Sequence, residues 1–145
     1  MTVTVPPSTF TVERGRVRLF AQVIGERGTV HDDLDVARAA GHPDLLVPPT
    51  FFYSVEIEDP EGFAFLADLG VRPDETILHG EQRFTYLADV HAGDTLLVEP
   101  RVGSVQPKKG GAMLMVERLS EFRRDGELVA RGTTTLVILR REESA

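Results

Sequence analysis

The chain has 145 residues, of which 41% are hydrophobic and 27% are charged, a length and composition typical of one globular domain. It has no cysteine, which excludes disulfide scaffolds, thiolate nucleophiles and zinc modules built on cysteine. The net charge of −7 argues against nucleic acid as a partner, and without a long apolar run or a basic leader we expect a cytoplasmic protein with no membrane partner. We expect a single domain over 1–145, ordered over about 9–141, with disordered ends.

The first part of the chain has helical periodicity. Apolar residues recur at spacings of three and four within 13–24, which predicts a helix that Thr11 caps and Gly25 ends. A second helix is expected over 34–40, with Gly41 as the left-handed residue after its last turn.

The segment 45–57 is rich in aromatic and β-branched residues, which by propensity alone favours a strand. Pro48 and Pro49 precede a stretch that is apolar on all sides, and proline is tolerated in the first turn of a helix. We therefore predict a buried helix here. A short helix over 61–69 follows, ended by Gly70.

From residue 77 onward the apolar period approaches two, which predicts long antiparallel strands. The strands are expected from 77 and over 95–105, 113–122 and 128–139, with hairpin turns at 108–111 and 124–127. A helix wrapped by such a sheet is the hot-dog architecture, so the predicted fold class is α+β.

A carboxylate and an imidazole follow the end of the first helix, as Glu26 and His31. Histidine titrates near neutrality and a carboxylate orients it or activates water, so such a pair can divide proton transfers between two substrate atoms. The spacing by itself equally suits two solvated loop residues.

Segments across the chain resemble the MaoC-like dehydratases and (R)-specific enoyl-CoA hydratases, in the branch found as an N-terminal domain or separate subunit. Gly25-Glu26 through His31, followed by Asp33, Ala37 and Gly41, is similar to the family signature Gly-Asp-x-Asn-Pro-x-His-x-Asp-x-x-x-Ala-x-x-x-Gly. The other similar segments are Leu46-Val47-Pro48-Pro49-Thr50-Phe51, His79-Gly80-Glu81-Gln82-Arg83-Phe84 and Ala92-Gly93-Asp94.

The resemblance implies a hydratase or dehydratase that interconverts (3R)-hydroxyacyl and trans-2-enoyl thioesters. It also implies an acyl-CoA or acyl carrier protein substrate, a homodimer or a heterodimer with a second hot-dog subunit, and no metal or redox cofactor. His31 takes the place of the family histidine and Glu26 that of its aspartate, and together they would bind and activate water. The expected substrate-binding residues, at the start of the central helix, are Pro49, Thr50, Phe51 and Phe52.

Three departures from the family pattern favour an alternative. Glu26 replaces the aspartate, Gly28 and Thr29 replace the asparagine and proline, and Pro49 replaces a glycine whose N–H lies near the thioester carbonyl. Proline has no such hydrogen. The alternative is a non-catalytic subunit that holds the acyl chain while a MaoC-like partner supplies the catalytic pair.

A second alternative is a hot-dog thioesterase, because Glu56 and Glu58 lie on the predicted central helix, where such enzymes carry their acidic residue. The other histidines have structural interpretations. His79 is expected to bond neighbouring backbone at a strand edge, and His42 and His91 to be solvated loop residues.

Overall fold

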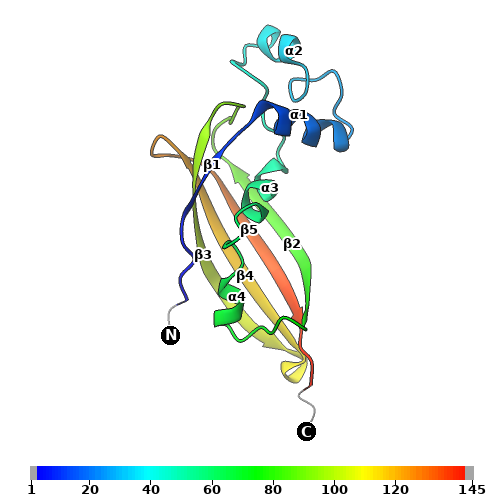
Figure 1. Cartoon of the computed structure of the whole chain (residues 1–145), viewed down its shortest axis with the longest axis vertical. Helices are drawn as coiled ribbons and strands as arrows, with labels where there is room; N and C mark the ends of the chain where they lie inside the picture. Colours follow the sequence, from blue (N-terminus) through cyan, green and yellow to red (C-terminus); the bar gives the residue numbers. More distant parts are fainter. Residues whose placement is uncertain (1–2, 143–145) are drawn as a thin grey trace.

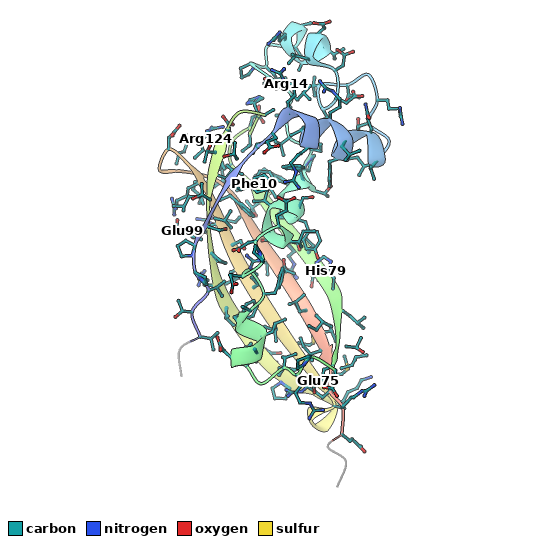
Figure 2. All side chains as sticks on the ribbon, in the orientation of Figure 1. Phe10, Arg14, Glu75, His79, Glu99 and Arg124 are labelled. Carbon is teal, nitrogen blue, oxygen red and sulfur yellow. The ribbon has the colours of Figure 1, made fainter. Side chains whose placement is uncertain are left out.

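A five-stranded antiparallel sheet forms the body of the protein, whose computed structural model describes residues 3–142. The strands are β1 Ser8–Thr11, β2 Thr76–Tyr86, β3 Thr95–Lys108, β4 Met113–Arg124 and β5 Glu127–Leu139. Their order across the sheet is β1-β3-β4-β5-β2 (Figure 1). The α+β hot-dog prediction is confirmed.

Among the described residues, four short α-helices accompany the sheet. They are α1 Arg14–Val23, α2 Leu34–Ala39, α3 Phe51–Ile57 and α4 Phe65–Asp68, and a 3-10 turn, η1 Lys109–Gly111, joins β3 to β4. Figure 1 shows α3 and α4 over one face of the sheet and α1 and α2 beyond one of its ends. Within residues 3–142, no helix is long and apolar enough to cross a membrane.

The long central strands bury one face because their side chains alternate in direction. In β4 every second residue from Leu114 to Phe122 is buried, and β5 shows the same alternation. The buried face packs against Phe51, Phe52 and Val55 of α3, which the spacing of a helix places on one side. This packing buries one side of the central helix, and Ile57 at its end stays half exposed.

The helix predicted over 45–57 begins only at Phe51. Leu46 forms an isolated antiparallel bridge with His91, and the Val47 N–H donates to the Val90 carbonyl, so the preceding residues are extended. The residue before a proline is disfavoured in the helical region, which explains why Val47 and Pro48 do not join the helix.

Two other predicted boundaries were wrong. The helix expected over 61–69 forms only at Phe65–Asp68, after a series of turns. Thr11 does not cap α1, because it belongs to the unpredicted strand β1 and pairs with Thr95, and Glu13 is the N-cap residue. Val5, in the segment expected to be disordered, is buried against the core, and 143–145 lie outside the described residues.

The strand β2 is an exposed edge. It pairs with β5 on one side, and among the described residues no strand pairs with its other side. Its apolar Ile77, Leu78 and Tyr86 are each about half exposed. An open edge of eleven residues with apolar side chains favours pairing with another chain.

Candidate active site

The segment between α1 and α2 is held in place by hydrogen bonds at both ends. Gly25 adopts a left-handed conformation (φ +90°), and the N–H groups of Gly25 and Glu26 donate to the carbonyls of Gln22 and Ala21. This is the Schellman arrangement that ends helices at a glycine. At the other end, the Asp33 carboxylate accepts from the first N–H groups of α2.

His31 lies in this segment with one ring nitrogen already engaged. Its Nδ1 is 2.7 Å from the Leu46 carbonyl oxygen, and its backbone N–H donates to the Thr29 hydroxyl. Because a carbonyl only accepts, Nδ1 carries the hydrogen of the neutral ring and Nε2 keeps a lone pair. The half-buried imidazole is therefore oriented for proton transfer through Nε2.

His31 faces a cavity of about 310 Å³, within the range of small-molecule sites. The described residues that line it are His31, Leu46, Val47, Pro49, Phe52, Tyr86, Ala88, Asp89 and Val90. Burial raises the pKa of Tyr86, and its protonated hydroxyl donates to the Pro49 carbonyl at 2.7 Å. The cavity, which we name the His31 cavity, is mostly apolar with a few polar groups.

The structure brings some of the predicted site residues together and not others. His31, Pro49 and Phe52 line the His31 cavity, whereas its lining among the described residues does not include Glu26, Thr50 or Phe51. Glu26 is half-buried at the end of α1 and Thr50 is exposed. Phe51 is buried elsewhere, with its ring edge-on to Phe10 and Phe20.

Tyr86 and Asp89 line the site, although no pattern in the sequence predicts them there. Tyr86 ends β2 and Asp89 lies in the following loop, and both reach the cavity that His31 borders. The alternation of apolar residues in β2 predicts on which face of the sheet Tyr86 lies but not which residues it contacts. No local motif marks Asp89. Both residues are more than fifty positions from His31 in the sequence, and only the fold brings them beside it.

The carboxylates proposed for a thioesterase do not reach the His31 cavity. Glu58 forms an ion pair with Arg16, and Glu56 is fully buried on the side of α3 that faces β5. The Thr134 hydroxyl lies 3.1 Å from Glu56 Oε2 and 2.7 Å from Gln82 Oε1. The Thr134 hydroxyl has a single hydrogen, so it donates to only one of these two acceptors at a time.

The remaining histidines also have side-chain partners. His79 stacks on Tyr53 with ring centroids 4.8 Å apart and lies 3.0 Å from Gln82 Oε1, so its partner is a side chain and not neighbouring backbone. His42 and His91 were expected to be solvated. Both are half-buried, and they contact each other through ring nitrogens 2.9 Å apart.

We expect the stability of the wild type to fall, relative to Glu56→Gln, as the pH rises above the ordinary pKa of glutamate, 4.5. Burial raises the pKa of Glu56, and Arg118 only partly opposes this effect. A group with a raised folded-state pKa stabilises the protein below its unfolded pKa, and that contribution is lost as the pH passes the folded value. Urea unfolding of both proteins from pH 4 to pH 8 measures the difference, and a constant difference would contradict the prediction.

Solved structures with the same fold come from dehydratases. The C-terminally truncated HadBC (3R-hydroxyacyl-ACP dehydratase) complex of Mycobacterium tuberculosis contains a chain with a TM-score of 0.73 and 25% identity, covering 94% of this chain and 98% of that one. A MaoC-like dehydratase of Rhodospirillum rubrum has a TM-score of 0.67 and 20% identity, covering 96% and 94%. The protein therefore has the hot-dog fold that these dehydratases share.

The chain belongs to the family described as "FAS1-like, dehydratase domain region", which matches residues 1–132. A UPF0336 protein of Streptomyces coelicolor is 32% identical, over 96% of this chain and 91% of the relative. The resemblance inferred from the short segments is thus confirmed at the level of the family.

Proposed function

We propose that the protein takes part in the interconversion of (3R)-hydroxyacyl and trans-2-enoyl thioesters, as the acyl-binding, non-catalytic member of a pair of hot-dog subunits. The composition of the His31 cavity carries this proposal. Its walls are mostly apolar, and they include His31 and Asp89 but not the carboxylate of Glu26. Addition of water to an enoyl group needs a proton removed from water and a proton delivered to carbon, and the cavity lacks the carboxylate that occupies the family position beside the histidine.

The start of α3 supports the same role. A hydratase needs fixed donors for the thioester oxygen, which gains negative charge during the reaction. Pro49 has no N–H to offer at the cavity, and the Phe51 N–H already donates to the Pro48 carbonyl at 3.0 Å. We therefore assign the donors for that oxygen to the partner subunit.

The open edge of β2 supports a hot-dog partner. A second subunit, in a heterodimer or a homodimer, would continue the sheet beyond β2 and cover its exposed apolar residues. The similar chain of Mycobacterium tuberculosis comes from a complex of a (3R)-hydroxyacyl-ACP dehydratase. We extend this arrangement to the present chain, with CoA or acyl carrier protein as the thioester carrier.

A second candidate is hydration or dehydration by this chain itself, and the geometry of His31 favours it. The Leu46 carbonyl fixes the tautomer that leaves Nε2 as a base toward the cavity. Glu26 is the carboxylate at the family position, and Asp89 is the carboxylate on the cavity wall. Either one would then orient or activate the attacking water, and the loss of activity in Glu26→Gln or Asp89→Asn would tell which.

The purified chain should bind a long-chain 3-hydroxyacyl-CoA and leave enoyl-CoA unhydrated until a MaoC-like subunit of the same organism is added. Ala88→Phe should weaken this binding about tenfold or more, because its ring displaces at least two methylenes of the acyl chain from the His31 cavity. Calorimetric titration measures the binding, and loss of enoyl absorbance measures hydration.

Ala67→Phe is the matched control, because Ala67 is exposed on α4 and outside the His31 cavity. It should bind like the wild type. Hydration by the chain alone that disappears in His31→Ala would replace the proposal with the second candidate. Equal acyl-CoA binding by Ala88→Phe and Ala67→Phe would overturn the assignment of the cavity to the acyl chain in both cases.

A further inference from the structure

Two imidazoles and a carboxylate gather beside the His31 cavity, and the non-catalytic function proposed first assigns them no role. One ligand atom from each of His42, Asp89 and His91 lies within 4.8 Å of the other two, and His42 Nδ1 is 2.9 Å from His91 Nε2. They come from the end of α2 and from the loop after β2, so the fold and not the sequence brings them together.

The backbone holds the two histidines in position independently of their side-chain contact. His42 closes the Schellman arrangement at the end of α2, where its N–H donates to the Ala37 carbonyl. His91 forms the antiparallel bridge with Leu46, and its N–H donates to the Asp94 carboxylate at 2.9 Å. The imidazoles are therefore presented from two fixed chain positions.

Arg124 of β4 holds the loop that carries Asp89 by hydrogen bonds. One guanidinium nitrogen of Arg124 donates to the Asp89 carbonyl at 2.7 Å and to the Asp94 carboxylate at 2.9 Å. The Asp89 side chain itself is exposed, so its carboxylate turns easily about its two side-chain bonds. One adjustable ligand beside two fixed ones suits a site that closes around an ion.

The spacing of the imidazole nitrogens fits metal coordination. Imidazole nitrogens lie about 2.0–2.1 Å from a bound zinc ion, so two nitrogens at right angles are about 2.9 Å apart and two at a tetrahedral angle about 3.3–3.4 Å apart. The observed separation of 2.9 Å equals the first value and is a few tenths of an ångström below the second.

We propose that His42, Asp89 and His91 form a binding site for a divalent transition-metal ion such as Zn²⁺. Two imidazoles and one carboxylate are ligands that suit such ions, with water completing the coordination. Because Asp89 also lines the His31 cavity, a bound ion would reverse the sign of the charge on that part of the cavity wall. The site requires neither of the functions considered above.

Tag-free protein, treated with chelator and returned to buffer at pH 7.5, should bind one Zn²⁺ per chain in a calorimetric titration. At a hundredfold excess of Zn²⁺ over its Kd, the unfolding midpoint should rise by roughly 10 °C. His42→Ala and His91→Ala should each weaken binding at least tenfold, since loss of even an outer-shell partner costs about 10–100-fold. His79→Ala is the matched control, because His79 lies outside the cluster and should leave binding unchanged.

An ordinary hydrogen bond between the two rings is the competing explanation of the 2.9 Å contact. The proposal would be overturned if the wild-type protein bound no Zn²⁺. It would also be overturned if the His42→Ala and His91→Ala variants bound Zn²⁺ as tightly as the wild type. If His91→Ala does not fold, ¹⁵N spectra of the wild-type imidazoles decide. Zn²⁺ should shift His42 Nδ1 and His91 Nε2 strongly and the nitrogens of His79 little, and unchanged signals from His42 and His91 would refute the site.

Discussion

Replacement of Glu56 by alanine should lower the free energy of unfolding at pH 8 by about 3–5 kcal/mol. Glu56 and Arg118 are both fully buried, on α3 and β4, and Arg118 is the charge that most strongly lowers the pKa of Glu56. Without the carboxylate, the guanidinium remains in the core with no opposite charge to compensate it there. Arginine cannot escape this penalty by losing its proton, so the cost appears as stability.

The surroundings of Arg118 make this penalty large. Among residues 3–142, its Nε and Nη1 have no hydrogen-bond partner, and the cation–π contact of its guanidinium with the Phe63 ring, 4.8 Å from the centroid, offsets only part of the cost. The double variant Glu56→Leu with Arg118→Met should recover most of the loss, because apolar residues of similar size need no compensation. A double variant no more stable than Glu56→Ala would contradict this explanation.

Urea unfolding followed by circular dichroism measures all of these variants. Glu58→Ala is the matched control, because Glu58 lies two residues further along, at the end of α3, and forms a partly exposed ion pair with Arg16. Its loss should cost about 1 kcal/mol or less. Equal effects of Glu56→Ala and Glu58→Ala would show that burial of the charge is not what matters.

Phe52→Ala should also lower the free energy of unfolding by about 3–5 kcal/mol. The Phe52 ring is buried and packs against the rings of Phe84, Tyr86 and Phe122 at centroid distances of 5.0–6.2 Å. Because Phe52 also forms part of the wall of the His31 cavity, its truncation should enlarge that cavity. We therefore expect the variant to retain binding of a long-chain 3-hydroxyacyl-CoA while it loses stability.

Tyr86→Phe is the control for Phe52→Ala within the same aromatic group. It keeps the ring and removes only the hydroxyl that donates to the Pro49 carbonyl, so it should cost about 1 kcal/mol or less. Chemical unfolding measures both variants, and calorimetric titration measures their binding. A loss below 1 kcal/mol for Phe52→Ala would show that the aromatic group does not support the core.

The separation of Glu26 from the cavity follows from how α1 ends. The Schellman arrangement fixes Glu26 by its N–H to the Ala21 carbonyl at 2.8 Å, so its position is set by the helix. His31 lies within a turn in which Asp32 and Asp33 donate their N–H groups to the Thr29 carbonyl, and the Leu46 carbonyl orients its ring. The positions of Glu26 and His31, five residues apart, are thus set by different parts of the fold.

Local patterns determined which elements form. Alternation of apolar residues predicted β3, β4 and β5, the helical period predicted α1, and the Asp125-Gly126 pair predicted the hairpin turn in which both residues have positive φ. These features depend on residues that are neighbours in the sequence. The family segments, including the one with His31, are also short contiguous stretches. The sequence therefore predicted the fold class and the family correctly.

Tertiary structure decided which side chains meet. The bridge between Leu46 and His91 joins segments 45 residues apart and holds the chain extended before the two prolines and α3. Tyr86 and Asp89 reach the His31 cavity, and Arg118 reaches Glu56, only because strands and loops distant in the chain pack around α3. Such contacts depend on register and packing, which no local pattern encodes.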